Sequence, residues 1–333
     1  MIDLAWNERK PLENLFFLFT LAMALVPFAI MVILFSFLIY NAIPSMRYSG
    51  FAFFTSYIWN PGMLYENPVL VHGVLAPYRS SFGMLGFFMG TMITTALALV
   101  IAFPVSIFLS LSLNLYTPQK LRKPFSVLVE LFAGIPSVVY GLWGVIVLEP
   151  VLLHIIEPWM KANLSFLPGF SGDVFSGAGI IAAGLILGIM IIPIVTAVIS
   201  ESMASQPREL KEGVYALGGT RWEVGKSVLL RNTKRQIVGG TLLGTGRALG
   251  ETMAVLMVSG AVVNVLPSSI FSLTNTMSAQ IAAALDSAFI DATGMNISAL
   301  VELGVVLVII SLIANLAGRA IVGRAALRGY ERD

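Results

Sequence analysis

Long uncharged, apolar stretches dominate the chain. A helix that crosses a bilayer needs about 20 mainly apolar residues. Six stretches meet this requirement, at residues 15–42, 84–114, 126–152, 176–200, 237–265 and 298–317. The fifth also contains Arg247 and Glu251. The pattern predicts an all-α polytopic membrane protein with six transmembrane helices. The first stretch is much longer than the roughly 7–15 apolar residues of a signal peptide, so we expect it to be a permanent helix.

The composition supports a lipid environment. Of the 333 residues, 57% are hydrophobic and 11% are charged, against about 45–50% and 25% in soluble domains. This balance excludes an ordinary soluble globule. The chain has no cysteine, which excludes disulfides, thiolate metal sites and a cysteine nucleophile. Only two histidines, His72 and His154, are present, which disfavours a histidine-based metal site.

The basic residues predict an orientation. Three of the twenty Lys and Arg, namely Arg47, Arg79 and Lys161, fall in loops on one side of the predicted spans, and sixteen fall on the other side. Cytoplasmic loops are enriched in Lys and Arg. Both termini lie on the basic side, so the sequence predicts that the N- and C-termini are cytoplasmic, as an even number of spans requires.

These spans divide the chain into four segments. Residues 1–43 form a cytoplasmic tail and the first transmembrane helix, 44–83 an extracytoplasmic segment, 84–318 a five-helix core, and 319–333 a cytoplasmic basic tail. Within the outer loops, 276–285 is apolar but too short to span, so we expect an interfacial or re-entrant helix. Glu302 falls near the outer end of the last span, where we expect its side chain to reach water.

The longest inner loop, 201–236, is patterned as a helical hairpin. Ser205 and Pro207 mark a helix start. Gly218 and Gly219 end that helix, and Thr220 with Glu223 forms a capping box for a second one. Such a hairpin suits a docking site for a protein partner. The alternative is an amphipathic hairpin that lies on the lipid surface.

Arg247 is the most informative single residue. An ionisable group at the centre of a span costs at least about 2.5–3.5 kcal/mol. Counting from Arg235 at roughly 1.5 Å per residue places Arg247 near mid-bilayer. A permanently charged guanidinium suits an oxyanion, and Glu251, four residues on and on the same helix face, would balance its charge. The alternative is an inert Arg–Glu pair beside the packing glycines Gly240 and Gly244.

A second candidate site lies at Pro136 and Ser137. Proline inside a span breaks the helix, and the N–H groups that follow point toward the break, where an anion can bind. Broken helices at mid-membrane often mark transporter sites. The alternative is a simple proline kink.

Two groups of residues resemble a known family. Glu212, Gly213, Val214, Gly218, Val228 and Leu230 match the spacing of the EAA loop of ABC importer permeases, although Gly213 and Val214 replace two alanines and Arg231 replaces a proline. The segments 246–255 (GRALGETMAV) and 133–141 (AGIPSVVYG) are similar to the C-type subunit of the phosphate-specific ABC permeases.

The resemblance implies a MetI-like ABC permease core in a bacterial or archaeal plasma membrane, with 201–236 as the coupling loop. It implies a substrate path that contains Arg247, Glu251, Thr252, Ser137 and Pro136. The residues it assigns to ATPase coupling are Glu212, Gly213, Ala216, Leu217, Gly218, Thr220 and Arg221.

The implied partners are a second, A-type permease subunit, a dimer of a cytoplasmic ATPase and an extracytoplasmic phosphate-binding protein. No cofactor or metal is expected on this chain, since ATP and Mg are used by the ATPase, and the chain has no G-x-x-x-x-G-K-[ST] loop. We therefore expect a non-catalytic subunit of a high-affinity phosphate importer. Alternatives are a permease for another oxyanion, a polytopic membrane enzyme that acts on lipid phosphates, or a stand-alone channel.

Overall fold

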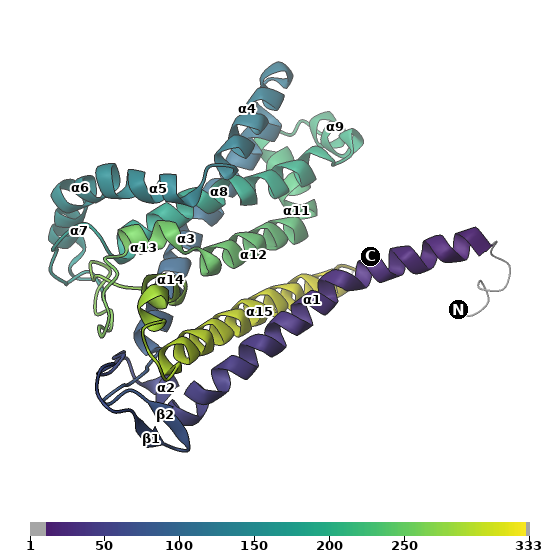
Figure 1. Cartoon of the computed structure of the whole chain (residues 1–333). Coiled ribbons are helices and arrows are strands. Elements are labelled where there is room, and N and C mark those ends of the chain that lie inside the picture. The colour runs from purple at the N-terminus through teal and green to yellow at the C-terminus, as the bar shows by residue number, and fades with distance from the viewer. Residues whose placement is uncertain (1–10, 331–333) are drawn as a thin grey trace.

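The computed structural model describes residues 11–330, with side chains except those of 11, 12, 319 and 321–330. The expectations for 1–10, for 331–333 and for the basic side chains of 319–328 lie outside the described residues. The helices are α1 (Pro11–Ser49), α2 (Ala52–Thr55), α3 (Leu85–Leu111), α4 (Gln119–Ala133), α5 (Ser137–Trp143), α6 (Glu149–Val151), α7 (Glu157–Leu164), α8 (Ile180–Ala204), α9 (Arg208–Ala216), α10 (Arg221–Val224), α11 (Leu230–Asn232), α12 (Lys234–Gly250), α13 (Met253–Val258), α14 (Met277–Ala288) and α15 (Met295–Tyr330). Two short strands, β1 (Val69–Val71) and β2 (Val74–Ala76), pair as an antiparallel hairpin (Figure 1).

Five helical segments of the described chain are long and apolar enough to cross a membrane: Glu13–Ser49, Leu85–Tyr116, Ser137–Leu164, Ile180–Ala204 and Met295–Gly318. Four of them confirm the first, second, fourth and sixth predicted spans. The helix expected at 276–285 is also present, as α14. The third and fifth predicted spans are wrong in their extent, because each contains a break.

The third predicted span, 126–152, is divided at Gly134–Pro136. Pro136 lacks an N–H group and its φ of −58° with ψ of 138° is not helical, so α4 ends and a new helix starts at Ser137. That helix continues to Leu164 through the π-helical turns Gly144–Leu148 and Leu152–Ile156. Each π turn is followed within two residues by a proline, Pro150 or Pro158. The wider turns let the chain pass both prolines without ending the helix.

The fifth predicted span, 237–265, is divided at Glu251–Thr252. Glu251 has φ −71° and ψ 125°, an extended conformation that ends α12 at Gly250. The six-residue helix α13 follows, and the chain from Ser259 to Thr276 is irregular. The side-chain hydroxyl of Ser278, at the start of α14, donates to the Glu251 carbonyl oxygen at 2.8 Å and holds the break in place.

A ladder of small polar side chains joins α3 to α8. Ser106, Ser110 and Asn114 lie on one face of α3 and its π-helical continuation, and they bond to α8 at intervals of four residues. The Ser106 and Ser110 hydroxyls each donate to an α8 carbonyl oxygen, of Ile192 and Thr196, at 3.2 Å. Inter-helix hydrogen bonds of this kind stabilise a pair by about 0.6 kcal/mol each on average. Because these hydrogen bonds repeat along both helices, α3 and α8 form the central helix pair.

Gly90 sets how closely α3 approaches the irregular segment before α14. A Cβ atom at this position would lie 2.1 Å from the Asn275 carbonyl oxygen. We expect Gly90→Ala to destabilise the fold by about 1–3 kcal/mol, because the backbone at Asn275 would have to move away from the added methyl group. The thermal unfolding midpoint of detergent-solubilised protein should fall by several degrees. Gly239→Ala is the matched control: a Cβ there meets nothing within 4 Å, so its midpoint should be unchanged or higher. Equal midpoints for both variants would contradict this assignment.

Helices α1 and α15 lie side by side (Figure 1). Pro44 removes one backbone donor from α1, and the Ser298 hydroxyl of α15 enters the neighbouring turn. It accepts from the Ser45 N–H at 3.0 Å and donates to the Asn41 carbonyl oxygen at 2.7 Å. One turn further along α15, Glu302 is 1% exposed. The expectation that Glu302 reaches water is wrong, because α1 covers it.

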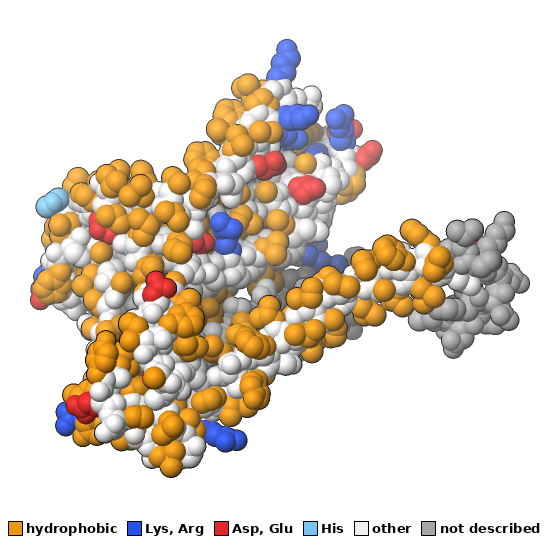
Figure 2. Space-filling view, in the orientation of Figure 1, with side chains coloured by type: hydrophobic (Ala, Val, Ile, Leu, Met, Phe, Trp, Pro, Cys, Tyr) orange, Lys and Arg blue, Asp and Glu red, His pale blue; other side chains and the backbone are white. Residues whose placement is uncertain are grey.

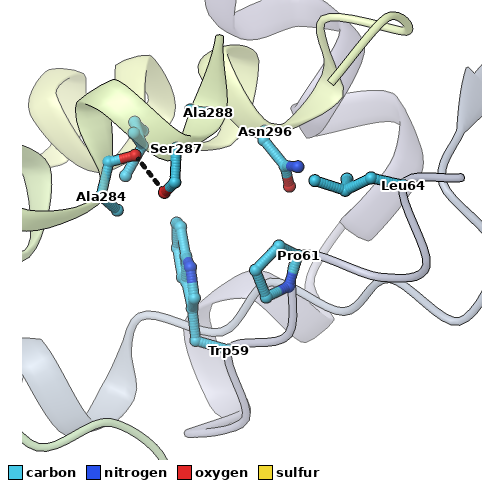
Figure 3. Close-up of a pocket in the computed structure, with 8 residues that line it drawn as sticks. Trp59, Pro61, Leu64, Ala284, Ser287, Ala288 and Asn296 are labelled. Atoms are coloured by element: carbon cyan, nitrogen blue, oxygen red, sulfur yellow. Dashed lines mark hydrogen bonds between the residues drawn. The ribbon is translucent and has the colours of Figure 1, made fainter. Parts of the chain in front are cut away.

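The segment between α2 and α3 packs through aromatic rings. The Trp59 indole lies 5.2 Å from the Phe82 ring and 5.5 Å from the Phe87 ring, measured between centroids. Its other side faces Ala284 and Ser287 of α14 (Figure 3). This cluster joins the end of α1, the start of α3 and the turn between α14 and α15 into one unit.

Charged side chains gather at the opposite end of the molecule. Figure 2 shows Lys, Arg, Asp and Glu concentrated where α4 and α9 lie, whereas hydrophobic side chains cover α1 and the helices α5 to α7. The exposed apolar residues of α1 and α15 are those of a surface that contacts lipid.

Candidate functional site

Arg247 lies just before the break that ends α12. Arg247 lies in the last turn of α12 and its side chain is exposed, whereas Glu251 and Thr252 are half-buried in the break. The Thr252 hydroxyl donates to the Gly250 carbonyl oxygen at 3.2 Å. The expectation that Glu251 shares a helix face with Arg247 is wrong, because the helix ends between the two residues. Among the described side chains, the single ion pair joins Lys161 and Asp173, so Arg247 is not paired with Glu251.

The break before α5 is held by a residue that the sequence analysis did not single out. The Tyr140 hydroxyl donates to the Phe132 carbonyl oxygen of α4 at 2.8 Å, across the break. Pro136 is exposed and Ser137, the first residue of α5, is half-buried. The spacing in the sequence could have indicated this bond. Tyr140 follows Pro136 by one helical turn, so its side chain points back over the interruption.

The two broken helices pack against each other. A Cβ atom at Gly141 of α5 would lie 3.1 Å from the Cα atom of Ala254 and 2.8 Å from the sulfur of Met257, both in α13. Gly141 therefore permits close contact within the first two turns of both helices. The fold thus brings together the two stretches, 133–141 and 246–255, that the sequence analysis named separately.

This arrangement is suited to transient contact with an anion. A guanidinium can donate two parallel hydrogen bonds to an oxyanion, and the Arg247 side chain is exposed rather than bound internally. Glycines keep α12 close to its neighbours: a Cβ atom at Gly244 would lie 2.8 Å from a Val195 methyl group of α8. At Gly246, a Cβ atom would lie 3.8 Å from the Asn315 amide nitrogen of α15. The arginine is therefore carried by a tightly packed helix.

The loop between α8 and α12 forms the predicted hairpin. Helix α9 begins after Pro207, and Gly218 has φ +82°, a left-handed conformation that favours glycine. Thr220 and Glu223 form both arms of a capping box, with the Thr220 N–H donating to the Glu223 carboxylate at 2.6 Å. These hydrogen bonds lower the pKa of Glu223. The local structure of the hairpin is confirmed.

The hairpin is anchored by one helix and exposed on the other. Val224, Val228 and Leu229 are buried against Leu111 and Ile199 in a common core. The residues predicted to couple to an ATPase are all exposed: Glu212, Gly213, Ala216, Leu217, Gly218, Thr220 and Arg221. Leu217 is 92% exposed, and the neighbouring Tyr215 and Ala216 are exposed too, so the end of α9 presents an apolar surface.

Arginine side chains of α4 and of the hairpin both bond to the chain at the end of α3. Arg122 of α4 donates to the carbonyl oxygens of Leu113, at 2.8 Å, and Asn114. Arg221 donates to the Leu115 carbonyl oxygen at 3.4 Å. Burial, together with the positive charges of Arg122 and Arg208, lowers the pKa of Lys211. The exposed hairpin therefore carries both basic residues and the exposed acidic residues Glu209, Glu212 and Glu223.

The capping box gives a local prediction. Thr220→Ala should destabilise the start of α10 by about 0.5–2 kcal/mol, because the Glu223 N–H loses its side-chain acceptor. Hydrogen exchange at the amides of Glu223 and Val224, which bond to the Thr220 hydroxyl and carbonyl oxygens, should accelerate by the corresponding factor, roughly 2- to 30-fold. In the control Ser227→Ala, a hydroxyl that donates to the Glu223 carbonyl is removed without loss of the cap, so these amides should exchange at the wild-type rate. Equal exchange in the two variants would show that the cap does not stabilise the hairpin.

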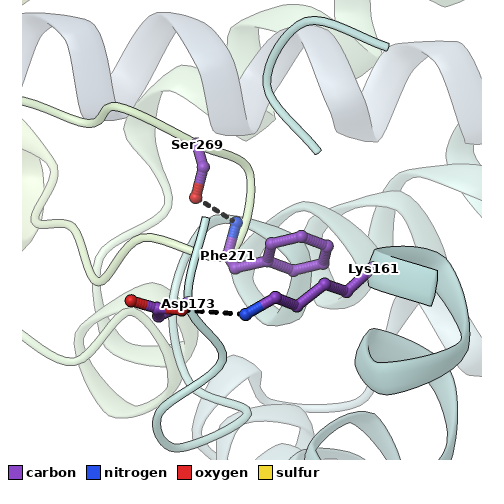
Figure 4. A network of polar contacts seen from close by, with 4 residues as sticks. All are labelled: Lys161, Asp173, Ser269 and Phe271. Carbon is purple, nitrogen blue, oxygen red and sulfur yellow. Dashed lines mark hydrogen bonds and ion pairs between the residues drawn. The ribbon is translucent and has the colours of Figure 1, made fainter. Parts of the chain in front are cut away.

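Lys161 and Asp173 form an exposed pair away from both breaks. The Lys161 ammonium donates to the Asp173 carboxylate at 2.8 Å, beside Phe271, whose N–H donates to the Ser269 hydroxyl at 3.2 Å (Figure 4). The hydrogen bond and charge of Lys161 lower the pKa of Asp173. Exposed pairs contribute little to stability, so this one orients the loop after α7. Within the described residues, no three His, Cys, Asp or Glu side chains form a group that could hold a metal ion.

The fold and the paired helix breaks define a polytopic membrane transport component. The chain belongs to the family of binding-protein-dependent transport system inner membrane components, whose family model matches residues 102–326. It is a permease subunit of an ABC transporter complex and a multi-pass protein of the inner membrane.

Within this family, the chain is similar to phosphate permeases. It is 39% identical over 306 residues to the phosphate transport system permease protein PstC 1 of Mycobacterium tuberculosis, covering 91% of this chain and 90% of the relative. It is 36% identical to the phosphate transport system permease protein PstC of Haemophilus influenzae over 93% of each chain. A chain of a bacterial alginate ABC transporter crystal structure shares the fold, with a TM-score of 0.56, 17% identity, and coverage of 94% of this chain and 99% of that chain.

Proposed function

We propose that this chain is the transmembrane permease subunit of an ATP-driven, high-affinity importer of inorganic phosphate. It forms the translocation path with a second permease subunit and receives phosphate from an extracytoplasmic binding protein. The names of its relatives, which are phosphate transport system permeases, support the choice of substrate. The observation that carries the mechanism is the exposed Arg247 at a helix break that packs against a second helix break.

Arg247 provides a transient contact for phosphate. Phosphate oxygens accept hydrogen bonds from the guanidinium in the two-pronged geometry that arginine prefers. A single exposed cation binds an anion weakly, and weak binding lets the substrate leave toward the cytoplasm. Glu251 and Thr252 lie in the break that follows, and Pro136 and Ser137 open the second broken helix, whose first N–H groups favour an anion.

The hairpin 201–236 couples this path to ATP hydrolysis in a separate subunit. The exposed face of α9 and the turn at Gly218 dock onto a cytoplasmic ATPase dimer, while Val224, Val228 and Leu229 hold the second helix in the permease core. Movement of the ATPases on binding ATP and Mg is then passed to α8 and α12, the two helices that flank the hairpin. The chain itself is non-catalytic and binds no cofactor.

Reconstitution tests this function. Proteoliposomes that contain the chain with the second permease, the ATPase and the phosphate-binding protein should accumulate radiolabelled phosphate only when ATP is present. Replacing phosphate by sulfate or arsenate separates phosphate transport from transport of another oxyanion. A complete complex that hydrolyses ATP without moving phosphate would contradict the proposal.

A further inference from the structure

Helix α15 carries a buried carboxyl group inside its membrane-spanning part. Glu302 lies seven residues after Met295, the first residue of α15, about 10 Å along the helix axis. Its side chain is 1% exposed, and its Oε2 atom makes no hydrogen bond. An ionisable group inside a membrane-spanning helix is costly and is a functional candidate for that reason. Neither the proposed substrate path nor the hairpin uses Glu302.

The contact between α1 and α15 encloses this carboxyl group. Ser298, one turn before Glu302 on the same face of α15, bonds to the Ser45 N–H and the Asn41 carbonyl oxygen of α1. Helical side chains lean toward the N-terminal end of their helix, so the Glu302 side chain extends toward the level of Ser298 and lies beside the Ser45 side chain. The Ser45 hydroxyl is buried and, like the Glu302 Oε2 atom, has no hydrogen-bond partner.

The described residues supply no cation to this carboxyl group. The single ion pair among them joins Lys161 and Asp173, and neither α3 nor the stretch 277–318 contains Lys, Arg or His. The titratable and charged groups on the elements packed against α15 and in the segment before α3 are Glu13, Tyr40, Arg47, Tyr48, Tyr57, Tyr65, Glu66, His72, Tyr78, Arg79, Lys234, Arg235, Arg247, Asp286 and Asp291. All are exposed except two. These two have other partners: the Tyr48 hydroxyl donates to the Ser80 carbonyl oxygen, and the Asp291 carboxylate accepts from the Asn296 N–H.

A proton fits this site better than a metal ion does. Among the described residues of α1 and α15, the buried side-chain oxygens without a partner belong to Ser45, Ser49, Asn296 and Glu302. They are fewer than the six or more oxygens, as an order of magnitude, that Ca²⁺ takes. A protonated carboxyl has one O–H donor, and a single neighbouring hydroxyl oxygen can accept from it. An ionised carboxylate would instead leave an unpaired charge in the contact, which costs far more than the neutral acid.

We propose that Glu302 is a proton-binding site that fastens α1 to α15. The proton bonds to a carboxylate oxygen of Glu302 and is shared with the Ser45 hydroxyl oxygen, which keeps the helix pair closed. Little else holds α1, because Ala42 and Ser45 are the buried residues of its described side chains (Figure 1). Loss of the proton places a charge in the contact, and α1 separates from α15 so that water reaches the carboxylate. This inference does not depend on phosphate as the substrate.

The pH dependence of stability tests the proton site. Glu302→Gln keeps the size of the side chain and removes its titration. The folded wild type retains a proton that the unfolded chain loses, so its stability falls as the pH rises, and the glutamine variant lacks this contribution. From about pH 5 to about pH 8, the thermal unfolding midpoint of the full chain in detergent should fall by at least about 2 °C more in the wild type than in Glu302→Gln.

The control for this comparison is Glu66→Gln, since Glu66 is exposed in the segment before α3. Its midpoint should follow that of the wild type across the same pH range. A merely structural glutamate would shift the Glu302→Gln midpoint equally at every pH, so parallel curves would overturn the proton site. Infrared spectroscopy gives a direct readout: the difference between wild type and Glu302→Gln at neutral pH should contain the band of a protonated carboxyl. A carboxylate band in its place would also overturn the site.

The distance between the two helices tests the fastening. The chain has no cysteine, so Ile30→Cys in α1 and Ile313→Cys in α15, both at exposed positions, can carry a pair of spin labels. We expect a single distance at low pH and an additional, longer one at high pH in the wild-type background. With Glu302→Gln, the single distance should persist at both. A wild-type distance that stays unchanged while the carboxyl band titrates would overturn the fastening of α1 by this proton.

Discussion

Arg247→Gln should lower ATP-dependent phosphate uptake by about 10- to 150-fold. Glutamine retains hydrogen-bonding groups but removes the charge, and hydrogen bonds to charged groups contribute about 1.5–3 kcal/mol each. Because the side chain is exposed at the end of α12 and has no ion-pair partner among the described residues, its removal should not disturb folding. Radiolabelled phosphate uptake into proteoliposomes measures the effect, and co-purification of the subunits checks assembly.

Two further variants sharpen this test. Arg247→Lys keeps the charge but loses the planar, two-pronged geometry, so uptake should lie between those of the wild type and the glutamine variant. Arg79→Gln is the control, since Arg79 lies over the Tyr78 ring at 5.5 Å in the segment before α3, away from the breaks. Its uptake should match the wild type. Full uptake by an assembled Arg247→Gln complex would remove the arginine from the proposed path.

Local chemistry made several elements predictable from the sequence. The capping box of Thr220 and Glu223 and the left-handed turn at Gly218 depend on residues within a few positions of each other, and both are present. The long helices α1, α3, α8 and α15 follow from apolar length alone, because a continuous apolar run has no other stable form in lipid.

The helix breaks could not be placed from apolar length, because contacts distant in the sequence stabilise them. Glu251 leaves the helix where its carbonyl is bonded by Ser278, twenty-seven residues later. The interruption at Pro136 had a local signal, yet its closure by Tyr140 and its packing against α13 through Gly141 depend on the tertiary fold. Glu302 is buried for the same reason, since its cover comes from α1, at the far end of the sequence.

Leu217→Asp should abolish stable association with the ATPase. Leu217 is 92% exposed beside the left-handed turn at Gly218. If the side chain enters a groove of the ATPase, its loss costs about 1.5–3 kcal/mol of burial, and an unpaired carboxylate placed there costs several kcal/mol more. Together these terms predict at least a 100-fold weaker complex. The measurement is the amount of ATPase that co-purifies with detergent-solubilised permease, with phosphate uptake as the second readout.

The matched control decides between the two interpretations of the hairpin. Leu70→Asp makes the same change at a position that is 70% exposed in β1, in the segment predicted to be extracytoplasmic, and should leave ATPase association unchanged. If the hairpin instead lies on the lipid surface, Leu217→Asp should weaken its contact with the membrane but leave the ATPase bound. Wild-type association of the Leu217→Asp variant would therefore assign the exposed leucine to lipid and remove it from the ATPase contact. Because Val224, Val228 and Leu229 remain buried in either case, the variant should insert and fold normally, so a loss of association would report on docking itself.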